Sequence, residues 1–351
     1  MSRFFSGRLS ALTPYTPGEQ PQDRSYIKLN TNESPYPPSP LAVSGAFEEA
    51  KKLQLYSDPD CRSLKKEAAA VLGFSEDELI FTNGSDEILN FAFMAYCDAE
   101  HPAAFADITY GFYPVFAAIN GVKFREIPLC EDFTIRVSDY TSSKETLFIA
   151  NPNAPTGIVL PRDAIEEIIS SNPDRIVVVD EAYVDFGGES AAPLIKKYEN
   201  LLVTRTFSKS RSLAGARLGF GIACPSLIRD LETIRFSTNP YNINRMTMAA
   251  GVGALKDTAY FEGNLREIMK TRQRTEEVLR GLGFTVLPSS ANFVFAKHSK
   301  IGGEELYLKL KACGILVRHF AKKRIKDFNR ITIGSPKEMD ALFAELRRIL
   351  S

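Results

Sequence analysis

The sequence has no excess of charge of either sign, since 43 Lys and Arg residues balance 43 Asp and Glu residues. No basic block interrupts this balance, so the charge pattern does not favour binding to nucleic acid or to a membrane surface. Cysteine is scarce, odd in number and never paired as CxxC, which argues against a disulfide framework and against a zinc site. We therefore expect no metal and a reducing environment. The five cysteines are Cys61, Cys97, Cys130, Cys224 and Cys313.

Long apolar runs, internal repeats and low-complexity tracts are also missing. The apolar patch near the N-terminus is limited to the surroundings of Phe4 and Phe5, and Pro14 and Pro17 follow soon after it. We identify neither a signal peptide nor a segment of membrane-spanning length. The lack of repeats argues against a solenoid or a disordered array. We expect a cytoplasmic protein.

The pattern that is present is an alternation of short β-rich runs with longer amphipathic segments, starting near residue 78. Runs such as Ile176–Val179 are apolar throughout, which is typical of strands buried on both faces. The alternation predicts an α/β fold, with a mostly parallel open sheet flanked by helices. We expect strands at Glu78–Thr82, Ala103–Asp107, Lys123–Ile127, Thr146–Ala150, Arg175–Asp180, Leu201–Arg205 and Leu218–Ala223, with helices at Asp86–Tyr96 and Arg162–Ser170 among others.

The 351 residues, 44% of them hydrophobic, are enough for more than one lobe. Residues 1–40 are rich in Pro, Ser, Thr and Asn and predict an extended arm, because proline prevents a regular helix. Residues 41–240 form the expected large lobe. Residues 241–351 predict a smaller α+β lobe that the arm joins, and a ligand would lie between the lobes. Its expected elements are helices Asn242–Leu255 and Thr258–Leu282, strands Phe293–Ala296, Ile315–Arg318 and Arg330–Ile333, and a closing helix after Pro336.

The strongest local signal is Thr206-Phe207-Ser208-Lys209, with Arg217 eight residues after the lysine. A lysine just past a buried strand can enter a cleft, where desolvation and nearby cations favour its neutral, nucleophilic amine. Ser208 and Arg217 offer a hydroxyl and a guanidinium fork to a phosphate. On this segment alone, a solvated lysine in a polar turn is the more common arrangement.

A second signal is Asp180 at the end of an apolar run, followed by Glu181, Ala182 and Tyr183. A buried carboxylate is costly unless it is paired, and a pyridinium N–H is a suitable partner because its proton makes the ring an electron sink. Tyr183, three residues later, could then bond a phenolic oxygen of that ring. A helix cap formed by Asp180 explains the local pattern equally well.

Two loops complete the set of candidate binding segments. Asn83–Glu87 joins an expected strand to a helix, and Gly84 allows a ligand to approach the free N–H groups of the helix start. Asn151–Gly157 follows another strand and contains two prolines and a glycine, which fix a tight loop at a usual place for binding groups. Taken singly, the first could be a plain helix cap and the second only a turn.

The order of these segments resembles the fold-type I pyridoxal-phosphate aminotransferases of the class I and II group, and within it the histidinol-phosphate aminotransferases. The resemblance covers nearly the whole chain. The segments that carry it are Leu12–Tyr15, Leu29–Glu33, Tyr56–Pro59, Tyr110–Tyr113, the loop from Asn151 to Gly157, Asp180–Tyr183, Thr206–Lys209 and Arg330–Gly334.

The resemblance implies that Lys209 forms the Schiff base with pyridoxal 5′-phosphate and moves a proton during the reaction. It implies that Asp180 pairs with the ring nitrogen, Tyr183 bonds the ring oxygen and Tyr110 stacks on the ring. Thr206 is a further cofactor contact. The cofactor's phosphate would be surrounded by Gly84, Ser85, Asp86, Ser208 and Arg217.

Substrate and partner follow from the same resemblance. Tyr56 would reach the cofactor phosphate of a neighbouring subunit, which implies a homodimer with shared sites. The implied reaction converts histidinol phosphate and 2-oxoglutarate to imidazole acetol phosphate and glutamate, in histidine biosynthesis. The residues expected to bind the substrate are Tyr15, Asn32, Arg318 and Arg330.

One position departs from the family pattern. The family's loop has asparagine directly before Pro-Thr-Gly, where it bonds the ring oxygen, and this sequence has Ala154 there. Either Asn153 or Asn151 replaces it through a shifted loop, or Tyr183 holds that oxygen without it; Asn153 is our candidate.

Three alternative functions remain open at this stage. Within the same fold, an O-phosphothreonine decarboxylase looks similar, although the Leu29–Glu33 segment favours the aminotransferase. An aromatic-amino-acid aminotransferase is the second, because the substrate pocket is the least legible part of the sequence. A non-catalytic regulator that binds pyridoxal phosphate is the third, and the absence of a recognisable DNA-binding segment argues against it.

Overall fold

The large lobe is built on a seven-stranded mixed sheet in the order β2-β8-β7-β6-β5-β3-β4. The computed structural model describes residues 2–10 and 12–351. Strand β8 runs antiparallel to both of its neighbours, and the other strands run parallel to one another. The predicted α/β fold is thereby confirmed. The strands are β2 (Leu79–Thr82), β3 (Ala103–Ala106), β4 (Phe124–Ile127), β5 (Thr146–Ala150), β6 (Val177–Asp180), β7 (Leu201–Thr206) and β8 (Gly219–Ala223).

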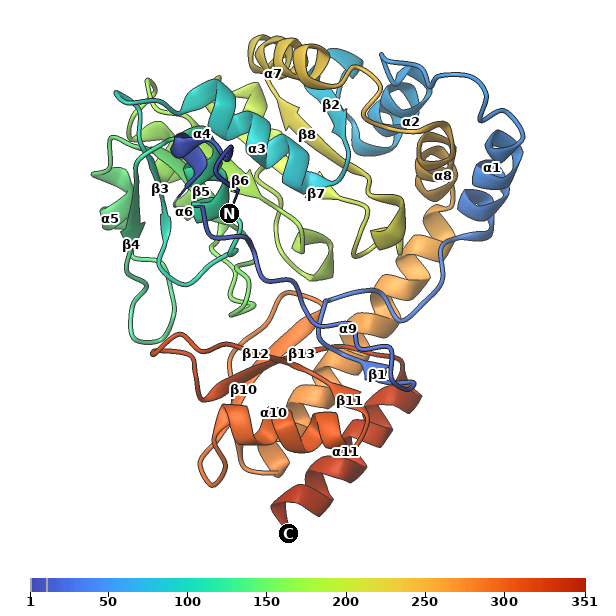
Figure 1. The fold of residues 1–351 in the computed structure, drawn as a ribbon, viewed down its shortest axis with the longest axis vertical. Coiled ribbons are helices and arrows are strands. Elements are labelled where there is room, and N and C mark those ends of the chain that lie inside the picture. The colour runs from blue at the N-terminus through green and yellow to red at the C-terminus, as the bar shows by residue number, and fades with distance from the viewer. Residues whose placement is uncertain (1, 11) are drawn as a thin grey trace.

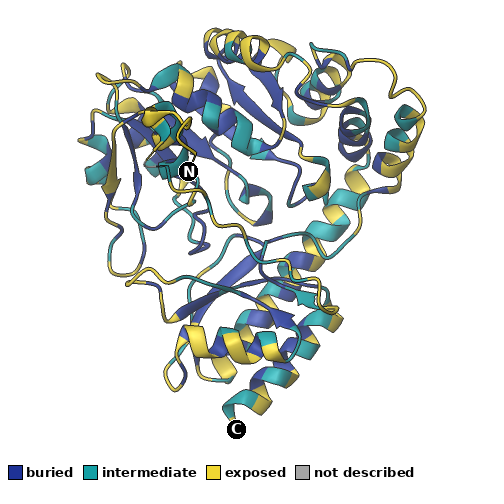
Figure 2. Ribbon diagram, viewed as in Figure 1, coloured by how far each residue is buried: buried dark blue, intermediate teal, exposed yellow. Residues whose placement is uncertain are grey.

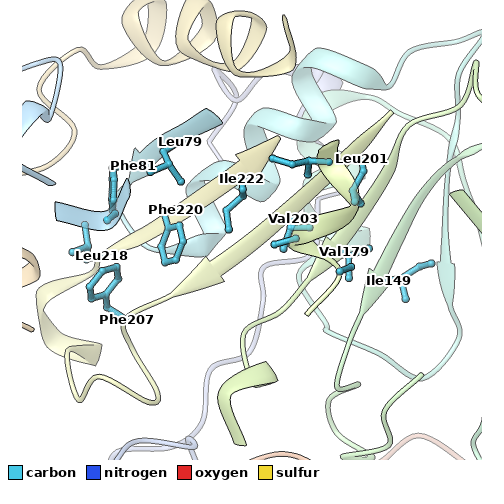
Figure 3. Close-up of a cluster of buried hydrophobic side chains, with 14 of the residues drawn as sticks. Leu79, Phe81, Ile149, Val179, Leu201, Val203, Phe207, Leu218, Phe220 and Ile222 are labelled. Atoms are coloured by element: carbon cyan, nitrogen blue, oxygen red, sulfur yellow. The ribbon is translucent and has the colours of Figure 1, made fainter. Parts of the chain in front are cut away.

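Helices cover both faces of this sheet (Figures 1 and 2). Side chains alternate along each strand, so Leu201 and Val203 of β7 pack in one apolar cluster and Leu202 packs in the other. Figure 3 shows the first of these faces, where Phe220 and Ile222 of β8 lie beside Val203. One face is covered by α3 (Ser85–Tyr96), α4 (Tyr113–Asn120) and α7 (Pro225–Thr238), and the other by α2 (Arg62–Leu72), α5 (Val137–Thr141) and α6 (Arg162–Ser170).

Helix α8 (Arg245–Lys256) belongs with the large lobe by its packing. It lies against α1 (Pro40–Ala50) and against α2. The approach to α1 is so close that a Cβ atom on Gly253 would lie 2.3 Å from the carbonyl oxygen of Leu41. Our predicted boundary at residue 240 assigned this helix to the small lobe, and the packing does not follow that division.

The small lobe has a four-stranded antiparallel sheet in the order β12-β13-β10-β9. The predicted strand at Ile315–Arg318 is divided, because β11 (Ile315–Leu316) pairs with the arm and β12 (Arg318–His319) pairs with β13. The remaining elements are β9 (Phe284–Val286), β10 (Phe293–His298), α10 (Gly303–Ala312), β13 (Phe328–Thr332) and α11 (Pro336–Leu350).

Two passages of the chain join the lobes. The arm pairs its strand β1 (Ile27–Lys28) with β11 and then reaches α1 through a proline-rich stretch. The second passage is α9 (Thr258–Gly281), a long helix that runs from α8 down into the small lobe (Figure 1). The passages lie side by side, since the Tyr260 hydroxyl donates to the Pro37 carbonyl oxygen at 2.9 Å. Among the helices of the described residues, none is long and apolar enough to cross a membrane.

Candidate active site between the lobes

Two adjoining cavities, of about 450 and 430 Å³, lie where the two lobes meet the arm. The first is bounded by the carboxyl ends of β5, β6 and β7, which contribute Ala150, Asp180 and Thr206. The second extends towards the small lobe and reaches β12 and β13. In parallel sheets this edge is the usual place for a ligand. The residues that line both cavities are Thr31, Tyr110, Ala154, Tyr183 and Lys209.

Lys209 projects into this shared space from the turn that follows β7. Its Nζ donates to the Thr31 carbonyl oxygen of the arm at 3.1 Å. Burial lowers the pKa of Lys209 to about 8, and the Arg330 guanidinium acts in the same direction. About a tenth of the amine is therefore neutral and nucleophilic at pH 7.

Asp180 lies at the end of β6 with a side chain that is almost fully buried. Its carboxylate accepts hydrogen bonds from the Tyr113 hydroxyl at 3.1 Å and from Thr204 Oγ1 at 3.2 Å. Burial nonetheless raises the pKa of Asp180 to about 6, so two hydroxyl donors do not fully compensate for the lost water. A cationic partner in the cavity would stabilise the ionised form.

Tyr113 and Thr204 were not among the residues we predicted for this site. Thr204 is the register partner of Asp180 on β7, so the strand pairing places its hydroxyl beside the carboxylate. Tyr113 belongs to the Tyr110–Tyr113 segment, but the sequence does not show that α4 directs it under the sheet edge.

An anion cradle forms at the start of α3. Gly84, at φ +79°, precedes Ser85, and a Cβ atom on this glycine would lie 2.5 Å from Nη2 of Arg217. Arg217 Nη1 donates to Ser208 Oγ at 3.4 Å, and its Nη2 pairs with Asp86 at 3.0 Å. The N-terminus of a helix together with a guanidinium and hydroxyls suits a phosphate group.

Tyr110, Thr206 and Tyr183, three further predicted cofactor contacts, also lie at the cavities. The Tyr110 hydroxyl donates to Asp86 at 2.6 Å, and burial with the nearby carboxylate raises the pKa of Tyr110 well above its usual value. The Thr206 hydroxyl donates to Ser208 Oγ at 3.0 Å. The Tyr183 hydroxyl accepts from Asn32 Nδ2 at 2.9 Å, so Asn32, predicted to bind substrate, is engaged with a tyrosine.

Two guanidinium groups line the second cavity from neighbouring strands. Arg318 of β12 and Arg330 of β13 are register partners. Arg330 donates to the Asn30 carbonyl oxygen at 3.0 Å, while its buried Nε has no protein partner. Arg318 donates to the carbonyl oxygens of Thr16 and Pro17, both at 3.0 Å. Paired guanidinium forks with an unused donor are suited to an anionic group.

An aromatic wall borders the same cavity. The Tyr15 ring of the arm stacks on Phe112 with 4.2 Å between ring centroids. Asp107, which also lines this cavity, pairs with Arg324 at 2.9 Å, and Arg324 donates to the carbonyl oxygens of Leu129 and Cys130. The small-lobe loop that carries Arg324 is therefore held against the large lobe.

Residues 24–346 match the family described as aminotransferase class I and II. The chain belongs to this family. Its sequence is 48% identical to the histidinol-phosphate aminotransferase of Brachyspira hyodysenteriae, over 100% of this chain and 99% of that protein. It is 46% identical to histidinol-phosphate aminotransferase 1 of Bradyrhizobium diazoefficiens, over the full length of both.

Solved structures of aminotransferases have the same fold. The histidinol-phosphate aminotransferase of Clostridium acetobutylicum superposes with a TM-score of 0.86 at 26% identity, covering 92% of this chain and 99% of that one. The enzyme of Sinorhizobium meliloti, in complex with pyridoxal 5′-phosphate, gives a TM-score of 0.85 at 26% identity, covering 93% and 91%. The family resemblance inferred from the sequence is confirmed.

The asparagine that we proposed for the aminotransferase loop does not reach the cavities. Asn153 Nδ2 donates to the Ile108 carbonyl oxygen at 2.9 Å and to Thr156 Oγ1 at 3.1 Å, and its Oδ1 accepts from Thr109. Asn151 is likewise engaged, through both of its amide atoms, with the Leu160 backbone. Both side chains hold the loop together, so Asn153 is not placed to replace the missing asparagine.

Tyr56 lies outside both cavities of its own aminotransferase chain. Its side chain is 80% exposed and stacks on Tyr241 with 4.6 Å between centroids. The Tyr56 carbonyl oxygen accepts from Arg245 at 3.0 Å, which helps to fix the backbone of this exposed residue. Within one chain this residue is not brought to the other site residues.

Proposed function

We propose that this aminotransferase transfers the amino group of histidinol phosphate to 2-oxoglutarate, with pyridoxal 5′-phosphate attached to Lys209. The observation that carries the proposal is the pair Arg318 and Arg330 in a cavity that also receives the Lys209 amine. Relatives with this name at 46–48% identity support the choice of substrate.

The first cavity has the groups that pyridoxal phosphate needs. The cradle of Ser85, Ser208 and Arg217, with Gly84 before it, fits its phosphate, and a side chain at Gly84 would collide with the Arg217 guanidinium. The hydrogen bonds to the buried carboxylate of Asp180 do not fully compensate for its loss of water. A protonated ring nitrogen would be a suitable further partner. When bound, the cofactor acts as an electron sink for the carbon that bears the amine.

The protein's own groups then have distinct tasks. Lys209 Nζ, with its lowered pKa, would accept and return the proton of the substrate carbon. Asp180 would keep the proton on the ring nitrogen, and Tyr183 would donate its hydroxyl proton to the ring oxygen. Tyr110 would lie against the ring face.

The second cavity suits both substrates in turn. Histidinol phosphate has a phosphate but no carboxylate, so its anionic end would bind between Arg318 and Arg330. The carboxylates of 2-oxoglutarate and glutamate would use the same donors. Tyr15, stacked on Phe112, offers an aromatic surface to the uncharged imidazole.

Substrate preference tests this proposal directly. We expect kcat/KM for histidinol phosphate to exceed that for phenylalanine and for O-phosphothreonine, with 2-oxoglutarate as acceptor. Arg330→Ala should lower kcat/KM in both half-reactions by about one to two decades, because a charge-assisted bond in a dry site is worth about 1.5–3 kcal/mol. Arg266→Ala, which removes an exposed guanidinium on α9, is the matched control. A preference for phenylalanine, or release of carbon dioxide from O-phosphothreonine, would refute the substrate assignment.

The capture of the cofactor should depend on pH through Lys209. Below its pKa of about 8 the amine is protonated, so the rate at which cofactor-free protein develops visible absorbance should rise about tenfold per pH unit and level off above pH 8. Arg330→Ala should move this profile to higher pH, because it removes a cation that lowers the lysine pKa. A profile unaffected by Arg330→Ala would contradict the electrostatic argument.

We further propose a homodimer with shared active sites, in the cytoplasm. An exposed apolar patch supports the dimer, because monomeric proteins rarely leave such patches in contact with water. All five cysteines are unpaired, in keeping with the proposed location. The patch lies on α1 and the segment that follows it, and its exposed side chains are Leu41, Val43, Phe47, Leu53, Leu55 and Tyr56.

Phe47→Asp should convert the dimer to monomers, since it places a charge within the proposed interface. Light scattering after size-exclusion chromatography would measure this. Leu308→Asp, which alters a similarly exposed apolar side chain on α10, should leave the mass unchanged. A wild-type protein that is monomeric at micromolar concentration would contradict the proposal.

Hybrid dimers test whether the sites are shared. A dimer of one Tyr56→Phe chain and one Lys209→Ala chain would have one site with both groups intact. Mixing the two inactive or weakened chains should therefore restore part of the activity at limiting cofactor. No recovery in hybrids verified by mass would show that Tyr56 acts in its own chain or has no role.

A further inference from the structure

Asn32 lies in the arm after β1, where its amide points towards the Tyr183 hydroxyl. Its Nδ2 is 2.9 Å from that oxygen. We infer that Asn32 is a positioning residue, which fixes the direction in which Tyr183 donates its proton to the ring oxygen of the cofactor. This inference rests on the proposed use of pyridoxal phosphate, and it assigns Asn32 to Tyr183 in place of the substrate.

The orientation of the amide follows from Thr332. Thr332 Oγ1 accepts from the Asn32 backbone N–H at 3.0 Å, and the same hydroxyl donates to Asn32 Oδ1 at 3.0 Å. If the amide were turned round, two donors would face the Thr332 oxygen and the hydroxyl hydrogen would lose its acceptor. The oxygen therefore faces Thr332, and the NH₂ group faces Tyr183.

Asn32 is also held firmly in place. Asn32 is only 1% exposed, and its backbone carbonyl oxygen accepts from Asn292 Nδ2 at 3.0 Å. Its backbone has φ +55°, a left-handed conformation that asparagine tolerates better than most residues. The small lobe supplies both anchoring residues, so it fixes an arm residue against a tyrosine of the large lobe.

The bond from Asn32 decides where the Tyr183 hydrogen goes. Because the phenol oxygen accepts from Asn32, its own hydrogen is directed elsewhere. Of the residues that line both cavities, Thr31 and Tyr110 have hydroxyls already donated to Glu33 and Asp86. Ala154 presents only a methyl group, and Tyr183 remains as the hydroxyl that can serve a ligand there.

The test is the pH titration of the visible absorbance of the holoenzyme. A hydrogen-bond donor to the ring oxygen of the cofactor would reduce the negative charge on that oxygen. The nitrogen that joins Lys209 to the cofactor would then hold its proton less strongly. Removal of the Asn32 amide should weaken that donor and raise the titration midpoint by about 0.5–1 pH unit. Asn32→Gly removes the side chain and keeps the left-handed backbone, and Thr332→Val removes the hydroxyl that orients the amide.

A double-mutant cycle separates positioning from general damage. In a Tyr183→Phe background, Asn32→Gly should produce no further shift, because the group through which it acts is gone. Asn30→Gly, which removes a neighbouring buried amide that donates to the Glu19 backbone, should leave the midpoint unchanged. If Asn32→Gly does not fold, as judged by thermal unfolding, Thr332→Val decides by the same cycle.

Failure of the proposed function and failure of the role of Asn32 would give different results. A wild-type protein that develops no visible absorbance with pyridoxal phosphate would overturn the proposed function itself. A normal wild-type spectrum with no shift in Asn32→Gly and Thr332→Val, or with shifts that persist in full beside Tyr183→Phe, would overturn the role of Asn32 alone.

Discussion

Lys209→Ala is expected to lower kcat by at least about a thousandfold, because one change removes both the covalent attachment point and the group that moves the proton. The position of the amine supports this, since Nζ enters the space common to both cavities and its pKa falls to about 8. The phosphate cradle and Asp180 would remain, so the variant should still bind the cofactor without a covalent bond.

The measurement combines single-turnover kinetics with borohydride reduction and peptide mass analysis. In the wild type the reduced cofactor should be found on the peptide that contains Lys209. Lys270→Ala, an exposed lysine of α9, should behave as the wild type. Label on any other lysine, or activity in Lys209→Ala within tenfold of the wild type, would exclude the assignment.

The second large effect is expected for Asp180→Asn, which keeps the shape of the side chain and removes its charge. Separating a buried charge from its partner costs about 3–5 kcal/mol. If most of this falls on the transition state, turnover should drop about 10²–10⁴-fold. Tyr113 and Thr204 each donate to one oxygen of this carboxylate. The NH₂ group of an asparagine at the same place would face one of these two hydroxyl donors, so one hydrogen bond would also be lost.

Visible spectra recorded together with the kinetics distinguish a slower chemical step from loss of the cofactor. Asp163→Asn, on the exposed first turn of α6, is the matched control and should retain full activity. A drop of less than tenfold in Asp180→Asn with cofactor still bound would contradict the proposed pairing with the ring nitrogen.

The strands of the large lobe could be predicted because their pattern is local. Val177–Val179 is apolar on both faces, and the structure buries these residues completely between two layers of helices. The division between β11 and β12 could not be predicted, because Ile315 and Arg318 pair with different partners, the arm and β13. The partner of Ile315 lies about 290 positions away and that of Arg318 lies 12 positions away, so the local sequence pattern does not predict these pairings.

The same distinction holds for the site. Lys209, Asp180 and Arg217 follow strands or turns with strong local signals, and the fold brings them to one cavity. Asn32 and Asn153 are alike in the sequence, each an asparagine in a loop beside a predicted site. Their roles differ because distant segments supply their hydrogen-bond partners. Asn32 bonds to Thr332 and Tyr183, and Asn153 bonds to the Ile108 carbonyl oxygen.

The bond between Tyr260 and Pro37 gives the two lobes a common corner. Both segments that join the lobes lie together there, so we expect any relative rotation of the lobes to turn about this corner. A second contact between the lobes pairs Arg324 of the small lobe with Asp107 of the large lobe at 2.9 Å. Such a rotation would change the width of the substrate cavity, because Arg318 and Arg330 line it from the small lobe and Lys209 lines it from the large lobe.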